Sequence, residues 1–461
     1  MTSFLPKPGD PMNGAAARTL PLARILLGVM LFAAPLPFGA VFTWAWGSLT
    51  IITLLVLILW MVGCIQDGRL KLGYSPLYVP LALMLVLGWM QLSFHLTLTP
   101  TATKESIFKL GTYFVLFFVV IQLFSGSSET TWRRVGIAVL SYGFLFSFLS
   151  ILQSFWNPAR IFLMARDIGA PFGPYVDRDH YAGLMEMLIP VSATYALSRP
   201  KHDPLNGILW FSVVIQGVSL LLTGSRGGFV ALLVEMAILG WIINWRNPLP
   251  GRRVRAAMIG SALVVVAALF FWLVPTYVLA KIGTMNSYVS EAKLGRPILW
   301  KDSLQIFRDH PLAGTGLGSY VTVYPLYQTE ASDLVTEHAH NDYLEALTET
   351  GVPGGILIFA ALLLFIPITF RNLTARLKRE PGYLQLGAGI ACCGLLIHSF
   401  FDFNLQIPAN AAWFTFCAGL AALSGQVFPR AGKKPEAGRF KPGFGVSYSE
   451  PPLRIRDGRA N

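Results

Sequence analysis

Long apolar runs recur along most of this chain and set its pattern. A transmembrane helix needs about 20 mainly apolar residues to cross the hydrocarbon core of a bilayer. The sequence predicts an all-α, polytopic integral membrane protein with about twelve spanning helices, near residues 21–42, 46–66, 75–94, 107–124, 134–155, 180–198, 206–223, 226–244, 254–275, 352–370, 384–400 and 408–427.

Composition agrees with this fold class. Of 461 residues, 54% are hydrophobic and 13% are charged, against about 25% charged in soluble domains. The four cysteines lie in or beside apolar runs, which argues against a disulfide framework or a zinc site. The first twenty residues do not resemble a cleaved signal peptide, so the first span is expected to act as its own signal. No internal repeat of 20–50 residues is visible.

The distribution of basic residues predicts the topology. With the N-terminus in the cytoplasm, most of the 36 Lys and Arg residues fall on the cytoplasmic side, as the positive-inside rule requires. Both termini are therefore predicted to be cytoplasmic. The predicted organisation is a cytoplasmic segment, helices one to nine, a long periplasmic loop with short helices, helices ten to twelve, and a basic disordered tail, at 1–20, 21–275, 276–351, 352–427 and 428–461.

The long loop contains the stretch LGRPILWKDSLQIFRDHPLAGTGLGSY at 294–320. Its apolar positions predict a short interfacial helix from Ile298 to Phe307, with Trp300 as a membrane-surface anchor. The glycines that follow allow the backbone to approach a ligand or a neighbouring helix. They do not form a dinucleotide fingerprint, because no strand–turn–helix context surrounds them.

The end of the same loop, EHAHNDYLEALTETGVPGG, concentrates titratable groups. His340 is expected near the first turn of a helix that enters the bilayer, where a neutral imidazole can take a proton from a sugar hydroxyl. Asp342 and Glu345 lie within about a turn and are expected to orient or acidify it. His338 competes for the role of base. The alternative is a histidine that merely caps a helix at the membrane interface.

Two arginines are candidate anion ligands. Arg226 lies in TGSRGGF at the outer end of a span, between small residues that leave its guanidinium accessible, and Arg296 opens the amphipathic part of the long loop. The planar, permanently charged guanidinium matches phosphate oxygens. The alternative is that each arginine extends to lipid headgroups.

Two further polar clusters lie on the outer side. FGPYVDRDHYAG carries Arg178, Asp179 and His180 before a span, and they are possible supporting residues. HSFFDFNLQIPAN carries Asp402, for which an arginine partner is expected. Ionisable groups are costly in the membrane and usually serve a function. The sequence therefore predicts a site at the outer leaflet for an anionic, lipid-anchored substrate.

Four blocks between about residues 170 and 425 resemble the O-antigen ligase and polymerase superfamily. His340-Asn341, nine residues and Gly351-Val352-Pro353-Gly354 match the signature H-[NSQ]-x9-G-x-x-G of the ligases. The other three blocks are the 295–320 stretch, TGSRGGF and HSFFDFNLQIPAN.

The resemblance implies a bacterial inner-membrane glycosyltransferase of lipopolysaccharide biosynthesis that needs no metal or other cofactor. Such enzymes transfer a glycan from undecaprenyl pyrophosphate to a hydroxyl of lipid A–core oligosaccharide or of a second lipid-linked glycan. Carried over by position, His340 is the general base, and Arg226 and Arg296 hold the pyrophosphate. The expected partners are these glycolipids and membrane lipids, with no nucleic acid.

Three other functions remain open. A polymerase of O-antigen or exopolysaccharide repeats is close to the ligase hypothesis. A transporter of lipid-linked glycan is less favoured, because transporters place polar groups near the midplane and often show repeated halves. A catalytically silent partner in polysaccharide assembly is the third alternative.

Overall fold

The computed structural model shows a helical bundle with one short hairpin, β1 (Arg160–Ile161) and β2 (Met164–Ala165). The structure describes residues 16–68, 70, 72–156, 160–161, 164–165, 171–200, 202–246, 296–330, 335–371 and 373–423. The predicted span 254–275, the first part of the long loop and the tail 428–461 lie outside the described residues.

Eleven of the twelve predicted spans coincide with described helices. These are α1 (Ala16–Ala33), α2 (Thr43–Asp67), α3 (Tyr78–Ser93), α4 (Pro100–Phe124), α5 (Glu129–Trp156), α6 (Arg178–Ser198), α7 (Asn206–Thr223), α8 (Arg226–Arg246), α12 (Asp342–Phe370), α14 (Glu380–His398) and α15 (Pro408–Ala422). Seven of the described helices, α2, α4, α5, α7, α8, α12 and α14, are long and apolar enough to cross a membrane, and α1 and α3 are shorter apolar helices. The all-α, polytopic fold is confirmed.

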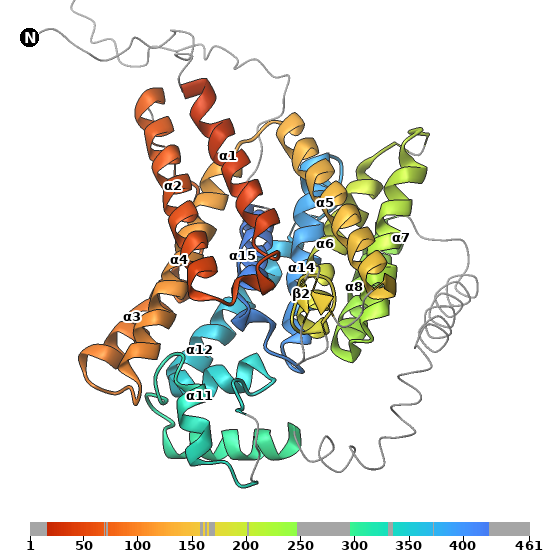
Figure 1. The fold of residues 1–461 in the computed structure, drawn as a ribbon. Coiled ribbons are helices and arrows are strands. Elements are labelled where there is room, and N and C mark those ends of the chain that lie inside the picture. The colour runs from red at the N-terminus through yellow and green to blue at the C-terminus, as the bar shows by residue number, and fades with distance from the viewer. Residues whose placement is uncertain are drawn as a thin grey trace, which may run out of the picture. The chain divides into compact units, whose positions relative to one another are not determined.

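Helices α6, α14 and α15 form the centre of the bundle, with α1 to α4 on one side and α5, α7 and α8 on the other (Figure 1). Every residue of α6 from 180 to 196 is buried. Small residues allow this close approach: a Cβ atom at Gly387 of α14 would lie 2.1 Å from Thr194 Oγ1 of α6. Close backbone contact through small residues is a common way to pack helices in a membrane.

Helix α12 begins ten residues before its predicted span and is kinked. The Asn341 side chain caps it by accepting hydrogen bonds from the Tyr343 and Leu344 amides, at 3.1 and 3.0 Å. Gly351 has φ 64° and ψ −162°, a conformation that needs glycine. The amide of Val352 donates instead to Pro311 O, at 2.8 Å. The kink separates a polar first segment of α12 from the predicted span 352–370.

Residues 296–330, called the outer segment after their predicted side of the membrane, form a small packed unit that contains α11 (Tyr320–Val323) and η2 (Tyr324–Leu326). Residues 296–309 are helical, as predicted, and run across the direction of the bundle helices in Figure 1. Trp300 was expected to anchor this helix at the membrane surface. Its indole N–H donates to Ala339 O, at 3.0 Å, and its ring packs on the core of this segment: Leu299, Ile306, Tyr320, Val323, Tyr324 and Ala339. Its role as a membrane-surface anchor remains a prediction.

Gln91 of α3 joins the bundle to the outer segment. Its Nε2 donates to Ala313 O and Glu349 O, at 2.7 and 2.8 Å, and its Oε1 accepts from the Leu317 amide, at 3.1 Å. The glycine-rich stretch therefore approaches neighbouring helices, one of the two roles predicted for it. Since Gln91 is fully buried, its three bonds satisfy backbone groups that water does not reach.

We expect Gln91→Leu to destabilise the outer segment. The substitution removes the Gln91 bonds of Ala313 O and the Leu317 amide, whereas Glu349 O keeps its bond from the Gly316 amide. At about 1–3 kcal/mol for each of the two unpaired groups, the total loss is about 2–6 kcal/mol. The measurement is thermal unfolding and protease resistance of the purified protein. Gln305→Leu is the matched control, since Gln305 is exposed and bonds only Asp309. Equal melting temperatures for the two variants would contradict the assignment.

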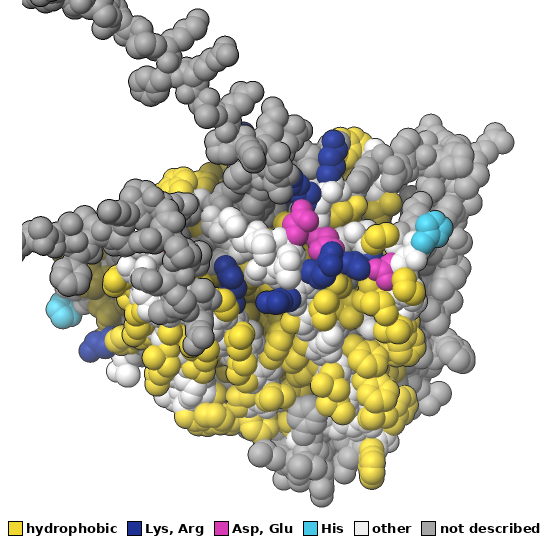
Figure 2. Space-filling model, turned by 90° about the horizontal axis from the view of Figure 1, so that it is seen from above, with side chains coloured by type: hydrophobic (Ala, Val, Ile, Leu, Met, Phe, Trp, Pro, Cys, Tyr) yellow, Lys and Arg dark blue, Asp and Glu magenta, His cyan; other side chains and the backbone are white. Residues whose placement is uncertain are grey.

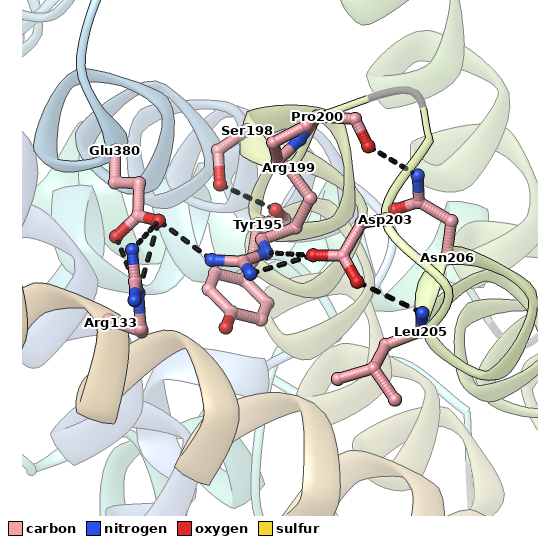
Figure 3. Close-up of polar contacts among 9 residues, drawn as sticks. All are labelled: Arg133, Tyr195, Ser198, Arg199, Pro200, Asp203, Leu205, Asn206 and Glu380. Atoms are coloured by element: carbon pink, nitrogen blue, oxygen red, sulfur yellow. Dashed lines mark hydrogen bonds and ion pairs between the residues drawn. The ribbon is translucent and has the colours of Figure 1, made fainter.

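Four charged side chains form a network where α6 ends and α14 begins (Figure 3). Glu380 Oε1 accepts from Arg133 Nη2 and Arg199 Nη1, at 2.9 and 3.0 Å, and Arg199 Nη2 also bonds Asp203 Oδ2, at 2.7 Å. With α14 about 27 Å long, this network is separate from the C-terminal end of α14 at His398.

Candidate active site

His340 and Asp402 form the centre of the site. His340 directly precedes the cap of α12, and Asp402 follows α14 in the turn toward α15. His340 Nδ1 lies 3.0 Å from Asp402 Oδ1; the His340 side chain is 36% exposed and that of Asp402 is 2% exposed. Its Nε2 makes no hydrogen bond within the described part of the chain. Asp402 therefore holds the Nδ1 side of the imidazole ring, and the Nε2 side is left open to a substrate.

His340 also has an unusual backbone conformation. Its φ is +48°, in the left-handed region. Such a conformation costs a non-glycine residue of the order of 1–3 kcal/mol, and it is often found at functional sites. The contact with Asp402 and the cap at Asn341 hold His340 in this position.

Three histidine rings surround Phe403. The ring of His338 stacks on it at 4.3 Å, while the rings of His180 and His340 meet it edge-on, at 4.6 and 4.8 Å. Histidines from α6 and from the loop before α12 are thus fixed around one aromatic side chain from the loop after α14. This role of Phe403 was not predicted from the sequence.

Asp402 lies between two of these histidines. Its Oδ2 is 3.9 Å from His180 Nε2, too long for a hydrogen bond but close enough for electrostatic attraction. Burial disfavours the charged carboxylate, but the hydrogen bond from His340 and the charges of His180 and His398 outweigh it and hold the pKa of Asp402 below its usual range. Asp402 is therefore a carboxylate at neutral pH. The expected arginine partner was wrong: the partners are histidines.

His338 has a different carboxylate. Its Nδ1 lies 2.8 Å from Glu345 Oε1, and Glu345 Oε2 accepts from the Ala339 amide, at 2.8 Å. Burial alone would lower the pKa of His338, but the charge and hydrogen bond of Glu345 raise it above its usual value. His338 therefore keeps its proton to a higher pH than a free histidine. A histidine that already bears a proton is poorly suited to act as a base.

We expect the stabilising effect of the His338–Glu345 pair to depend on pH. A histidine whose pKa is raised by folding contributes stability that is fully present below about pH 6.5 and is lost as pH rises through its folded pKa. Glu345→Gln should therefore lower stability at pH 6 by about 1.5–3 kcal/mol, and by less at pH 9. Melting temperatures of both proteins at both pH values test this. A difference that grows with pH would contradict it.

Asp342 and Glu345 were expected to orient His340, but both bond other groups. Asp342 Oδ2 accepts from Ser399 Oγ and from the Leu405 amide, at 2.7 and 3.2 Å. Asp342 therefore ties the start of α12 to the turn that carries Asp402, while Glu345 serves His338. Asp402, 62 positions from His340 in the sequence, provides the orienting carboxylate.

The polar cluster at residues 177–180 packs beside this site. The Asp177 side chain caps α6 by accepting from the Asp179 amide, at 2.8 Å. The buried His180 is thereby fixed in the first turn of α6. Six residues further along α6, Glu186 Oε1 bonds His398 Nδ1, at 2.8 Å, and both side chains are almost fully buried. His180 is thus part of the site, and Arg178 and Asp179 are beside it.

Arg226 begins α8 and is exposed, as predicted. It lies between two glycines that pack against the site: a Cβ atom at Gly227 would lie 2.5 Å from His398 Nε2, and the Arg178 guanidinium is 3.8 Å from the corresponding position at Gly224. Arg178 and Arg226 therefore lie at the same end of the bundle as His340. Arg296 is also exposed, at the start of helix 296–309. Within the described residues, Arg296 contacts neither Arg226 nor His340.

Within the described ranges, no group of three or more His, Cys, Asp or Glu side chains is arranged to hold a metal ion. Metal-independent transfer remains a prediction. The groups present can accept a proton at His340 and attract an anion through arginines and the N-termini of α6 and α8.

The fold and the site define a multi-pass helical membrane protein with an exposed histidine held by a buried carboxylate at one end. Residues 211–359 match the family model described as O-antigen ligase. The chain is also 26% identical over 317 residues to an O-antigen ligase of Pseudomonas aeruginosa, covering 67% of this chain and 68% of that protein. Both comparisons show that the chain is similar to O-antigen ligases, in agreement with the resemblance noted in its sequence.

Proposed function

We propose that this protein is a ligase-type glycosyltransferase that moves a glycan from undecaprenyl pyrophosphate to a hydroxyl of lipid A–core oligosaccharide. The site faces the periplasm in the proposed N-in, C-in topology of the bacterial inner membrane. The observation that carries the proposal is the contact of 3.0 Å between His340 Nδ1 and the buried Asp402 carboxylate, with the imidazole partly exposed. The similarity to O-antigen ligases supports the same reaction class.

In the proposed reaction, His340 Nε2 takes the proton of the acceptor hydroxyl as its oxygen attacks the anomeric carbon. The bond from that carbon to the pyrophosphate oxygen breaks, and the pyrophosphate leaves with the electron pair. Asp402 holds the ring and stabilises the imidazolium that forms. Arg226 and Arg296 balance the charge that develops on the leaving group. Arg178 is a further candidate for this role because of its place beside Gly224.

A polymerase that joins lipid-linked repeats would use the same chemistry with a different acceptor. A transporter is less well supported, because the His–Asp pair, the three histidines around Phe403 and Arg226 gather at one end of the helices. Transporters place such groups near the midplane.

Deletion of the gene in its host, with complementation by wild type, distinguishes these functions. A ligase predicts that the deletion strain accumulates full-length lipid-linked polymer that is not attached to lipid A–core. Single repeats in place of long chains would identify a polymerase. Unchanged, attached glycan in the deletion strain would contradict both enzymatic functions. Surface glycans are compared on gels, and the complementing protein is confirmed by immunoblot.

A further inference from the structure

A cavity opens at the end of the bundle opposite His340. It has a volume of about 440 Å³ and lies between α1, α5 and α15. Its walls are apolar along their length. The packed rings of Phe32 and Trp413, with centroids 5.8 Å apart, line its deep end, and the Trp413 indole is fixed by a hydrogen bond of 2.9 Å to Leu31 O.

The mouth of this groove is cationic. Arg24 and Arg134 line it together with Thr131, and none of the described residues that line it is acidic. Arg24 is held in place, because Nε and Nη2 donate to Leu123 O, at 3.0 and 2.7 Å. Its Nη1 makes no such bond, and Arg134 is exposed and unpaired within the described part of the chain. Figure 2 looks onto this end, where Lys and Arg side chains gather.

The neighbouring arginines differ from this pair. Arg133 and Arg199 are paired with the carboxylate of Glu380, so their charges are largely balanced (Figure 3). The unbalanced positive charge at this end therefore includes the two arginines at the mouth of the groove.

We propose that this groove binds an anionic diacyl phospholipid, with the phosphate between Arg24 and Arg134 and one acyl chain in the groove. The length of the groove agrees with the depth that an acyl chain reaches in one leaflet. From Arg24 to Phe32 along α1 is about 12 Å, close to the depth of about 15 Å of one leaflet. In the proposed topology this end faces the cytoplasmic leaflet, whose anionic lipids attract basic residues. The site is independent of glycan transfer at the other end.

Charge argues against a second copy of the chain as the occupant. A two-fold interface brings the same surface patch of each subunit together. Arg24 and Arg134 would then meet their own counterparts, and like charges would repel. An anionic headgroup supplies the opposite charge that the mouth lacks.

Native mass spectrometry of the full-length protein in uncharged detergent tests the proposal. The probes are phosphatidylglycerol and phosphatidylcholine with the same acyl chains. We expect phosphatidylglycerol to bind at least fivefold more tightly. Arg134→Gln and Arg24→Gln should each weaken its binding about fivefold, the effect of about 1 kcal/mol per basic residue. Arg133→Gln, the adjacent paired arginine, should leave it unchanged.

Glycine substitutions test the acyl part of the site without disturbing the fold. Gly28 lines the groove, and a Cβ atom there would meet nothing within 4 Å. Gly28→Phe should fill the groove and abolish the preference for phosphatidylglycerol. Gly47 of α2 is equally open but does not line the groove, so Gly47→Phe is the matched control. Equal binding of the two lipids, or an unchanged preference in Gly28→Phe, would overturn the proposal. Dimers that dissociate in Gly28→Phe would assign the groove to a second copy instead.

Discussion

Replacing His340 with alanine is expected to lower the rate of glycan transfer by about 10²–10⁴, the usual contribution of a general base. The protein should still fold, because the His340 side chain is 36% exposed and the cap of α12 is made by Asn341. The predicted result in the host is unattached lipid-linked polymer on a gel. With purified protein, the result is loss of transfer to the acceptor at unchanged donor binding.

Three variants separate this role from its alternatives. His338→Ala removes the competing histidine and should retain more activity than His340→Ala. Asp402→Asn keeps the shape of the carboxylate but removes its charge, so its activity should lie between that of His340→Ala and that of wild type. His202→Ala, at an exposed position near the opposite end of α6, should have no effect. Normally attached glycan in a well-expressed His340→Ala strain would refute the assignment of the base.

The helices could be predicted from the sequence because lipid leaves few alternatives. A backbone in the hydrocarbon must satisfy its own hydrogen bonds, so long apolar runs become helices. The first turn of α12 was expected near His340, and the helix begins at Asp342, ten residues before its apolar span 352–370. The partners of its polar residues were not predicted: Asp342, Glu345 and Glu349 bond Ser399, His338 and the Tyr320 amide, respectively. Local polarity cannot reveal partners that come from other elements.

The candidate site shows the same limit. A motif identified His340, and the small residues around Arg226 correctly predicted its exposure. The carboxylate of His340 was expected among its near neighbours Asp342 and Glu345, yet it is Asp402, 62 positions away. Phe403 lay beside that aspartate in an apolar stretch, where one more aromatic residue carries no information. Only the packing of α6, α12 and α14 brings the three histidines to its ring.

Replacing Arg226 with alanine is expected to cost about 10²–10³ in the turnover rate, the effect of removing one preorganised donor that stabilises developing charge. The pyrophosphate gains charge as its bond to the sugar breaks, so the arginine should stabilise the transition state more than the bound donor. The turnover rate should therefore fall more than the apparent donor affinity. Both constants are measured with purified protein and a lipid-linked donor.

Matched substitutions show which arginines stabilise the leaving pyrophosphate. Arg226→Lys should recover only part of the rate, because an ammonium cannot offer the planar fork of a guanidinium. Arg296→Ala should show a comparable loss if Arg296 faces the same anion, whereas Arg308→Ala, at an exposed position of the same helix 296–309, should be silent. If Arg226→Ala keeps the full rate and Arg178→Ala does not, the anion lies at the start of α6 and Arg178 takes the role proposed for Arg226.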